Sequence, residues 1–140
     1  MDAIRKLNKW ANSHTSLPLD VIRIVLGAFI FYKGINFSVH TNYLYNILNP
    51  LDEYLGTVMI VHYVTMVHLA GGILIVIGLI TRLAVLVQIP VLIGAILINF
   101  IGVMNTTNLT ASIVVFLACL FFLVYGSGKH SVDYALKMQM

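Results

Sequence analysis

The feature that most constrains the fold of this chain is a run of 46 residues, from Leu83 to Gly128, that contains no aspartate, glutamate, lysine or arginine. A second run without these residues lies between Glu53 and Arg82. Charged residues make up 9% of the chain, whereas an average soluble domain has about 25%. A soluble domain with a single core has no means of covering two such apolar runs. The sequence therefore predicts an integral membrane protein.

The apolar runs divide into segments of the length that a membrane helix needs. About 20 helical residues, at roughly 1.5 Å each, cross the ~30 Å hydrocarbon core of a bilayer. The long run exceeds this length and contains a polar, turn-forming stretch, GVMNTTN, at residues 102–108, where we divide it. We predict a single domain over residues 1–140, an all-α bundle of four transmembrane helices at about residues 17–37, 54–80, 83–101 and 109–126.

The basic residues indicate how this bundle is oriented. Six of the eight lysines and arginines fall on one side of a four-helix arrangement, namely Arg5, Lys6, Lys9, Arg82, Lys129 and Lys137. Because cytoplasmic segments carry an excess of lysine and arginine, both termini are predicted to lie in the cytoplasm. The formal net charge of +3 follows from this topology, so it does not indicate nucleic-acid binding.

Three segments are expected outside the bilayer. Residues 3–13 place apolar side chains at helical spacing among basic ones, which is typical of a helix that lies on the bilayer surface and contacts its lipids; a frayed basic tail is the alternative. Residues 38–53 form the longest external segment, a loop expected to cap the outer end of the bundle. Ser131 is expected to cap a short helix at residues 131–138.

Glycines recur at seven-residue spacing in the first two predicted spans, at Gly27 and Gly34 and at Gly71 and Gly78. Residues seven apart lie on one side of a helix, and small residues there allow two helices to approach closely. We therefore expect these glycines to mark a seam between helices.

The polar residues within the spans fall into two predicted layers. Counting about 1.5 Å per residue from the cytoplasmic helix ends puts Arg23 and Gln88 about 8–9 Å deep. The same count puts the members of an outer layer about 21–27 Å deep and His68 near the middle. The outer layer consists of Lys33, His62, Asn99 and Ser112.

The outer polar residues form the candidate ligand site. Such groups are costly at membrane depth and usually face the bundle interior. They could donate hydrogen bonds to the carbonyl of a lipid-soluble ligand such as a quinone, and the candidate residues are Lys33, Asn36, His62, His68 and Asn99. The alternative is that they make hydrogen bonds between helices or, for Lys33, reach the membrane surface.

The cytoplasmic helix ends carry a second polar set, which we predict to form a structural ion-pair latch: Asp20, Arg23, Arg82, Ser131 and Asp133. Asp20 and Arg23 stand three residues apart on one helix face and are expected to pair. Asp133 lies on the same side of the membrane as both arginines. We therefore expect it to pair with Arg23 or Arg82.

Several catalytic centres are incompatible with this sequence. Both intramembrane histidines lie on one predicted span, whereas a bis-histidine haem needs them on facing helices, unless a dimer supplies the second. Glu53, the only glutamate, lies outside the spans, so a carboxylate-bridged di-iron site is not expected. Cys119 is the only cysteine, which excludes a cysteine-pair thiol oxidase. We predict no catalytic residues and no metal site, with quinone as the one candidate cofactor.

The chain contains three stretches, at residues 22–37, 68–86 and 126–136, that together resemble the DoxX family of membrane proteins. HLAGGILIVIGLITRLAVL at residues 68–86 is similar to the family's glycine-rich second span, which ends in Gly-Leu-x-Thr-Arg. GSGKHSVDYAL at residues 126–136 resembles its closing motif, and IRIVLGAFIFYKGINF at residues 22–37 resembles its first span. The resemblance implies a four-helix protein of the bacterial inner membrane. On the family's polar positions stand Arg23, Arg82, Ser131 and Asp133.

The resemblance implies several roles. Some relatives are subunits of quinone-reducing or quinol-oxidising complexes, and others are linked to thiol and oxidative-stress systems. Our leading hypothesis is an accessory subunit, or a module that binds a membrane protein partner or a lipid-soluble ligand, without a self-sufficient catalytic site. The first alternative is a quinone-interacting oxidoreductase subunit that uses the outer layer. The second is a transporter of small molecules or lipids acting as a homo-oligomer.

Overall fold

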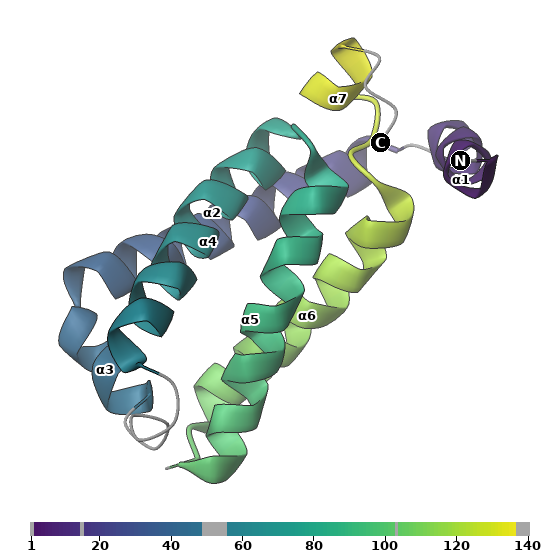
Figure 1. The fold of residues 1–140 in the computed structure, drawn as a ribbon. Helices are drawn as coiled ribbons and strands as arrows, with labels where there is room; N and C mark the ends of the chain where they lie inside the picture. Colours follow the sequence, from purple (N-terminus) through teal and green to yellow (C-terminus); the bar gives the residue numbers. More distant parts are fainter. Residues whose placement is uncertain (1, 15, 49–55, 103, 137–140) are drawn as a thin grey trace.

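A computed structural model describes residues 2–14, 16–48, 56–102 and 104–136 of the chain. These described residues form helices and no strands (Figure 1). The helices are α1 (Asp2–Ser13), α2 (Leu17–Val39), α3 (Thr41–Leu48), α4 (Thr57–Ile77), α5 (Thr81–Ile101), α6 (Thr106–Tyr125) and α7 (Val132–Ala135). The all-helical fold expected from the sequence is confirmed for this part of the chain.

Three of the described helices are long and apolar enough to cross a membrane, namely α4, α5 and α6. Helix α2 is longer, with 23 residues, but its apolar sequence is interrupted by Asp20, Arg23 and Lys33. Its mode of insertion therefore depends on where these three charges lie in the fold.

The four long helices are arranged as two pairs. Helix α2 packs along α4 and helix α5 packs along α6, while α4 and α5 bring the pairs together (Figure 1). The pairs lie close at the end that carries α1, α7 and the turn between α4 and α5, which we call the terminal end. They diverge toward the opposite end, which carries α3 and which we call the α3 end (Figure 1).

Helices α2 and α4 approach closely because glycines lie between them. A Cβ atom added to Gly72 would lie 2.6 Å from the backbone nitrogen of Phe31. One added to Gly27 would lie 2.7 Å from the backbone nitrogen of Val76. Any larger side chain would therefore collide with the backbone of the facing helix. This contact also fixes the register, because it sets Gly27 of α2 opposite Val76 of α4.

The predicted glycine seam is partly wrong. Gly34 lies in it, 2.9 Å from the backbone nitrogen of Leu69 by the same measure. Gly71, however, faces Gln88 of α5, and Gly78 ends α4 beside Arg23. Neighbouring helical residues point about 100° apart, so Gly72 occupies the place that we expected for Gly71.

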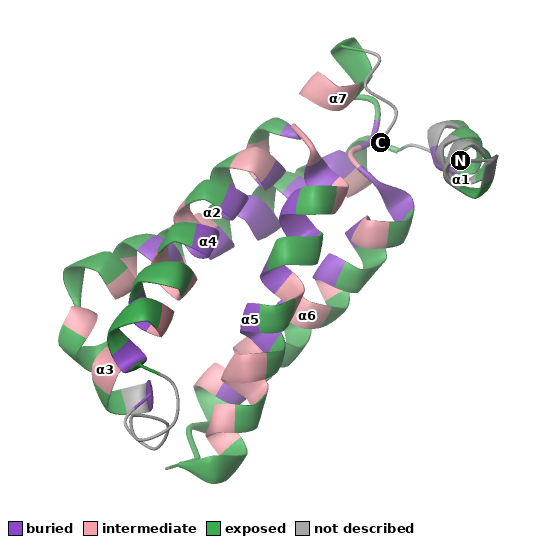
Figure 2. Ribbon diagram, viewed as in Figure 1, coloured by how far each residue is buried: buried purple, intermediate pink, exposed green. Residues whose placement is uncertain are grey.

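The main apolar core joins the two helix pairs (Figure 2). Ile75, Val85 and Cys119 in this core are fully inaccessible to solvent, and Cys119 is a buried free thiol. The core draws on all four long helices: its buried members are Leu26, Ile30, Ile75, Ala84, Val85, Leu92, Val115, Cys119, Phe122 and Tyr125.

A helix that the sequence did not predict covers the α3 end. Residues 41–48 form α3 where a capping loop was expected, and residues 49–53 of that loop lie outside the described residues. Leu44 and Leu48 are buried with Val61 of α4, and Ile98 of α5 packs against them. Because Leu44 and Leu48 are four residues apart, they share one face of α3, and burying this face on α4 stabilises so short a helix.

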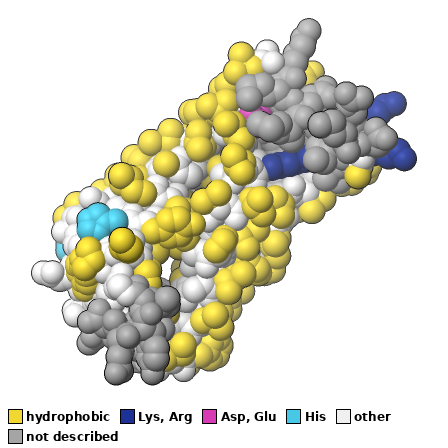
Figure 3. All heavy atoms as spheres, in the orientation of Figure 1, with side chains coloured by type: hydrophobic (Ala, Val, Ile, Leu, Met, Phe, Trp, Pro, Cys, Tyr) yellow, Lys and Arg dark blue, Asp and Glu magenta, His cyan; other side chains and the backbone are white. Residues whose placement is uncertain are grey.

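The sides of the molecule are apolar, and most of the charged side chains that the structure describes lie at one end. Figure 3 shows hydrophobic side chains along the visible flanks, lysine and arginine at the terminal end, and histidine toward the α3 end. Large apolar side chains such as Met59, Phe100 and Leu117 are 82%, 69% and 59% exposed. A monomer in water rarely exposes so continuous an apolar surface, so the described structure is that of an integral membrane protein.

Candidate functional site

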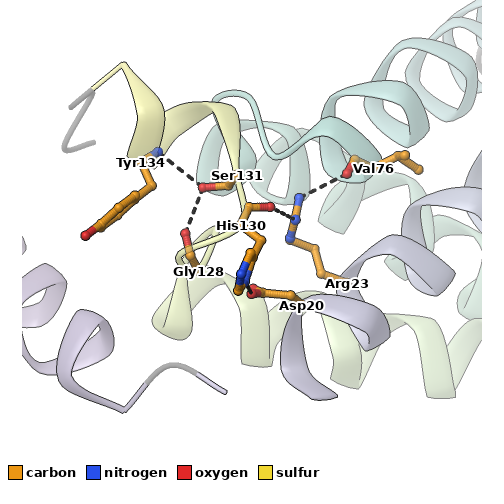
Figure 4. A network of polar contacts seen from close by, with 7 residues as sticks. All are labelled: Asp20, Arg23, Val76, Gly128, His130, Ser131 and Tyr134. Atoms are coloured by element: carbon orange, nitrogen blue, oxygen red, sulfur yellow. Dashed lines mark hydrogen bonds and ion pairs between the residues drawn. The ribbon is translucent and has the colours of Figure 1, made fainter. Parts of the chain in front are cut away.

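Arg23 closes the end of helix α4. Its Nη1 atom donates hydrogen bonds to the carbonyl oxygens of Ile75 at 2.7 Å and Val76 at 3.1 Å, and its Nη2 atom donates to the carbonyl of His130 at 2.8 Å (Figure 4). Ile75 and Val76 belong to the last turn of α4, whose carbonyls have no partner within the helix. The positive guanidinium therefore stands at the negative end of the helix dipole. Arg23 itself is only 1% exposed.

Asp133 closes the start of helix α5 in the complementary way. Its carboxylate accepts the backbone N–H of Ile80 at 2.7 Å and that of Thr81 at 3.1 Å. These are N–H groups at a helix N-terminus, where a negative charge is favourable. Asp133 also donates its own backbone N–H to the carbonyl of Gly78 at 3.0 Å. The α4–α5 turn is thus held at three of its residues by one aspartate.

The turn held by Asp133 is strained. Ile80 has φ 50° and is the only described residue other than glycine with a positive φ. A β-branched side chain disfavours this left-handed conformation, which persists only where surrounding contacts fix it. The hydrogen bond from Ile80 to Asp133 is such a contact. Gly78, with φ 70°, supplies the other left-handed residue of the turn without this steric cost.

Arg82 binds the C-terminal end of α6. Its Nη2 atom donates to the carbonyl oxygen of Val124 at 3.1 Å, in the last turn of that helix. The guanidinium lies over Gly126, where an added Cβ atom would be 3.3 Å from both Nε and Nη2. The two arginines and Asp133 therefore bind three different helix ends, each with the charge that its helix dipole favours.

Asp20 pairs with a histidine that the predicted latch did not include. The Nδ1 atom of His130 lies 2.6 Å from Oδ2 of Asp20 (Figure 4), and Asp20 is 3% exposed. Among the described residues this is the one close contact between a carboxylate and a basic side chain. The expected pairs of Asp20 with Arg23, and of Asp133 with an arginine, do not form, because backbone groups at the helix ends occupy Arg23 and Asp133.

The predicted cap at Ser131 is present. The Oγ atom of Ser131 accepts the backbone N–H of Tyr134 at 3.2 Å and donates to the carbonyl of Gly128 at 2.8 Å (Figure 4). Helix α7 spans only Val132–Ala135, shorter than the expected 131–138, and residues 137–138 lie outside the described residues. The structure thus brings Asp20, Arg23, Ser131 and Asp133 together at the terminal end, with Arg82 at the neighbouring end of α6.

A second polar site lies in the middle of the bundle, where His68 of α4 meets Gln88 of α5. Their Nε2 atoms are 3.2 Å apart, and the residues are 7% and 0% exposed. The Nδ1 atom of His68 lies 2.9 Å from the carbonyl of Val64. Because a carbonyl only accepts, Nδ1 carries the proton, and Nε2 of the neutral ring accepts from the Gln88 amide. The ring of Phe37 meets His68 edge-on at 5.2 Å.

Gln88 keeps one unused acceptor. Once its amide nitrogen faces His68, its Oε1 atom is buried and has no hydrogen-bond partner in the described structure. A buried acceptor of this kind costs about 1–3 kcal/mol unless something donates to it. From the sequence, we placed Gln88 with Arg23 in the layer nearer the cytoplasm and did not include it in the candidate ligand site. Counting residues gives depth along one helix, but it does not reveal which helices face each other.

Two of the remaining ligand candidates, His62 and Asn99, make their hydrogen bonds away from His68. His62 is exposed and its Nδ1 atom contacts the carbonyl of Val58 within α4. Asn99 donates to the carbonyl of Ala95 and accepts the N–H of Asn105, which fixes the α5–α6 turn. The remaining two are on α2: Lys33, partly buried with its Nζ atom 5.8 Å from the ring centre of Phe29, and Asn36, also partly buried.

The predicted outer layer is also wrong in depth. Gly34 contacts His68 and Leu69, so its neighbour Lys33 lies near the level of His68. His62 lies six residues nearer the start of α4, about 9 Å further toward the α3 end. His68 is therefore the one histidine placed between the helix pairs.

Comparison with known proteins gives one match. A family model described as DoxX matches residues 19–102, more than half of the chain. No curated protein and no solved structure matches. The matched range contains Arg23, the His68–Gln88 pair and the α4–α5 turn. The closing motif at residues 126–136 lies outside it, yet Asp133 of this motif binds the turn.

Proposed function

The chain belongs to the DoxX family, and from this premise we propose that it is a four-helix protein of the bacterial inner membrane with both termini in the cytoplasm. It acts there as an accessory module that binds a membrane partner or a lipid-soluble ligand, and it does not catalyse a reaction on its own.

The position of α2 supports four membrane crossings. Asp20 and Arg23 are buried at the terminal end, so neither charge faces lipid. Backbone contacts at Gly27, Gly34 and Gly72 hold α2 along α4, which is long and apolar enough to span a bilayer. A helix packed along a spanning helix occupies the same depth of the membrane, so α2 crosses with it. The basic residues at the terminal end then favour a cytoplasmic location for that end.

The structural contacts made by the charged residues at the terminal end support an accessory role. Arg23, Arg82 and Asp133 are each bound to a helix end, and Asp20 is bound to His130. Arg23, Arg82 and Asp133 hold helix ends in place, and the Asp20–His130 contact joins α2 to the segment that follows α6. This use of charge is the observation that carries the proposal.

Affinity purification in mild detergent tests this role. We expect the tagged protein to leave its native membranes with a stoichiometric protein partner or a bound lipid-soluble molecule. The matched control is the Arg23→Met variant, in which the α4 cap is lost. Isolation of a folded parent protein free of any partner and any bound molecule would contradict the proposal.

The His68–Gln88 pair favours a second candidate, a quinone-interacting subunit. Oε1 of Gln88 and the ring of His68 lie between the helix pairs, and a quinol hydroxyl is a donor for such an acceptor. Solvent extraction of the purified protein should then yield quinone in stoichiometric amount, and Gln88→Leu should lose it while Asn99→Ala retains it. Quinone-free protein from quinone-containing membranes would exclude this candidate.

A further inference from the structure

We propose that helix α1 is a binding surface for anionic phospholipid headgroups, placed at the face of the membrane from which α2 begins. This inference concerns residues 2–13 and is independent of the accessory role proposed above. It rests on the exposed side chains Lys6, Lys9 and Trp10 and on the position of α1 at the terminal end.

The two lysines and the tryptophan share one face of α1. Lys6 stands three residues before Lys9 and four before Trp10, so its side chain is a neighbour of both on the helix surface. Lys6 and Lys9 are exposed and Trp10 is 52% exposed. Ala11, which lies away from this face, is 4% exposed where α1 contacts α6. Contact with the bundle on one side thus holds the basic, aromatic face outward.

The chain keeps α1 within reach of the headgroups. Helix α1 ends at Ser13 and α2 begins at Leu17, so at most about 14 Å of extended chain separates them. The headgroup region on each side of a bilayer is about 5–8 Å thick. A helix tethered this closely to a membrane-embedded helix remains in or beside the headgroup layer.

Among the described side chains, no carboxylate neutralises Lys6 or Lys9. The described carboxylates at the terminal end are occupied, Asp20 by His130 and Asp133 by the α5 backbone. No ion pair within the described structure involves Lys6 or Lys9. Lysine side chains near a bilayer attract anionic lipids, and each contributes about a fivefold factor in binding.

Trp10 completes a headgroup-binding face. An indole has an apolar ring and an N–H donor, which suits the boundary between headgroups and acyl chains. The ring of Trp10 stacks on that of His14 with centroids 5.0 Å apart, and Ser13 donates its hydroxyl to the Trp10 carbonyl at 2.7 Å. The stacking contact holds the ring against His14, at the end of α1 nearest to α2.

Trp10 also provides the test, because it is the only tryptophan in the chain. The full-length protein is placed in nanodiscs of phosphatidylcholine alone or of phosphatidylcholine mixed with phosphatidylglycerol. We expect the Trp10 emission to shift to shorter wavelength with phosphatidylglycerol, to be quenched by brominated acyl chains, and to lose both effects at high salt. The docking constant of α1 obtained from the emission should fall about fivefold for each lysine removed, in Lys6→Gln and Lys9→Gln.

The matched control is Lys129→Gln, which removes an exposed lysine of the terminal end outside α1 and should leave the shift unchanged. Equal emission in both lipids would overturn the proposal. So would a lipid-dependent shift that survives in the Lys6→Gln/Lys9→Gln variant. A short-wavelength emission that brominated lipids do not quench would show that protein, such as a second copy, covers Trp10, and this too would overturn it.

Discussion

The backbone N–H of Ile80 donates to Oδ1 of Asp133 at 2.7 Å, across 53 residues of sequence. The two residues come from two of the three stretches that resemble the DoxX family, residues 68–86 and 126–136. In the fold these stretches meet. The strained turn between α4 and α5 is thereby held by the segment that follows α6, which ties the two helix pairs together at the terminal end.

Removing the carboxylate of Asp133 should destabilise the protein. Asp133→Ala leaves two N–H groups of the α5 N-terminus without their acceptor and removes the contact that offsets the strain at Ile80, so we expect a loss of about 1–2 kcal/mol of unfolding free energy. Asp133→Asn keeps one oxygen and should lose less. The measurement is thermal unfolding in detergent, with the exposed Tyr134→Phe as the control. A Tm for Asp133→Ala equal to that of the parent would contradict this role.

Replacement of Arg23 should have a larger effect. Arg23→Met removes three hydrogen bonds and leaves buried carbonyls without donors, at about 1–3 kcal/mol each. Arg23→Lys keeps the charge but not the planar fork that reaches carbonyls of two segments at once, so it should restore only part of the stability. The same unfolding assay applies. Full recovery in Arg23→Lys would show that charge alone matters and that the forked geometry does not.

The close approach of α2 and α4 gives a test with an internal control. Gly72→Ala places a methyl group against the backbone of Phe31 and should cost about 1–3 kcal/mol through overpacking. Gly94→Ala makes the same chemical change inside α5, where nothing lies within 4 Å of the added atom. It should be neutral or stabilise by up to about 1 kcal/mol. Equal stability changes in the two variants would contradict the close contact of α2 and α4 at Gly72.

The proposed topology predicts which positions a membrane-impermeant thiol reagent reaches. A Cys119→Ala background removes the only cysteine, and the exposed residues Asn42 and Lys129 accept single replacements. Asn42→Cys should be labelled in intact cells, and Lys129→Cys only after the inner membrane is permeabilised. If both positions are labelled from the same side, α2 does not cross as proposed or the chain lacks four spans.

The long helices could be predicted because their signal is local. Runs such as Leu83–Gly128 are apolar over whole helix lengths, and the polar stretch at residues 102–108 divides this run where α5 ends and α6 begins. The capping role of Ser131 is also local, since it concerns the N–H three residues later. Helix α3 was missed because it is short and depends on burying Leu44 and Leu48 against α4.

The partners of the polar residues could not be predicted because they depend on how the helices are offset. Gly27 lies opposite Val76, so the part of α2 before Gly27 extends past the end of α4 at Ile77. This offset carries Arg23 to the last carbonyls of α4, and it carries Lys33 to the level of His68. Counting from the separate helix ends assumes no offset, and for that reason it put Lys33 beside His62. Asp133 was expected beside an arginine because both lie on one side of the membrane, and sidedness does not reveal that backbone groups at helix ends are their partners.

Native mass spectrometry of the protein released directly from its own membranes tests the central claim most directly. The chain has a mass of 15.5 kDa, so a bound protein partner, a lipid-soluble ligand and a second copy each give a distinct added mass. We predict an assembly that contains a stoichiometric partner protein or a small lipid-soluble molecule. Only the bare chain, or copies of it with nothing else bound, would contradict the account.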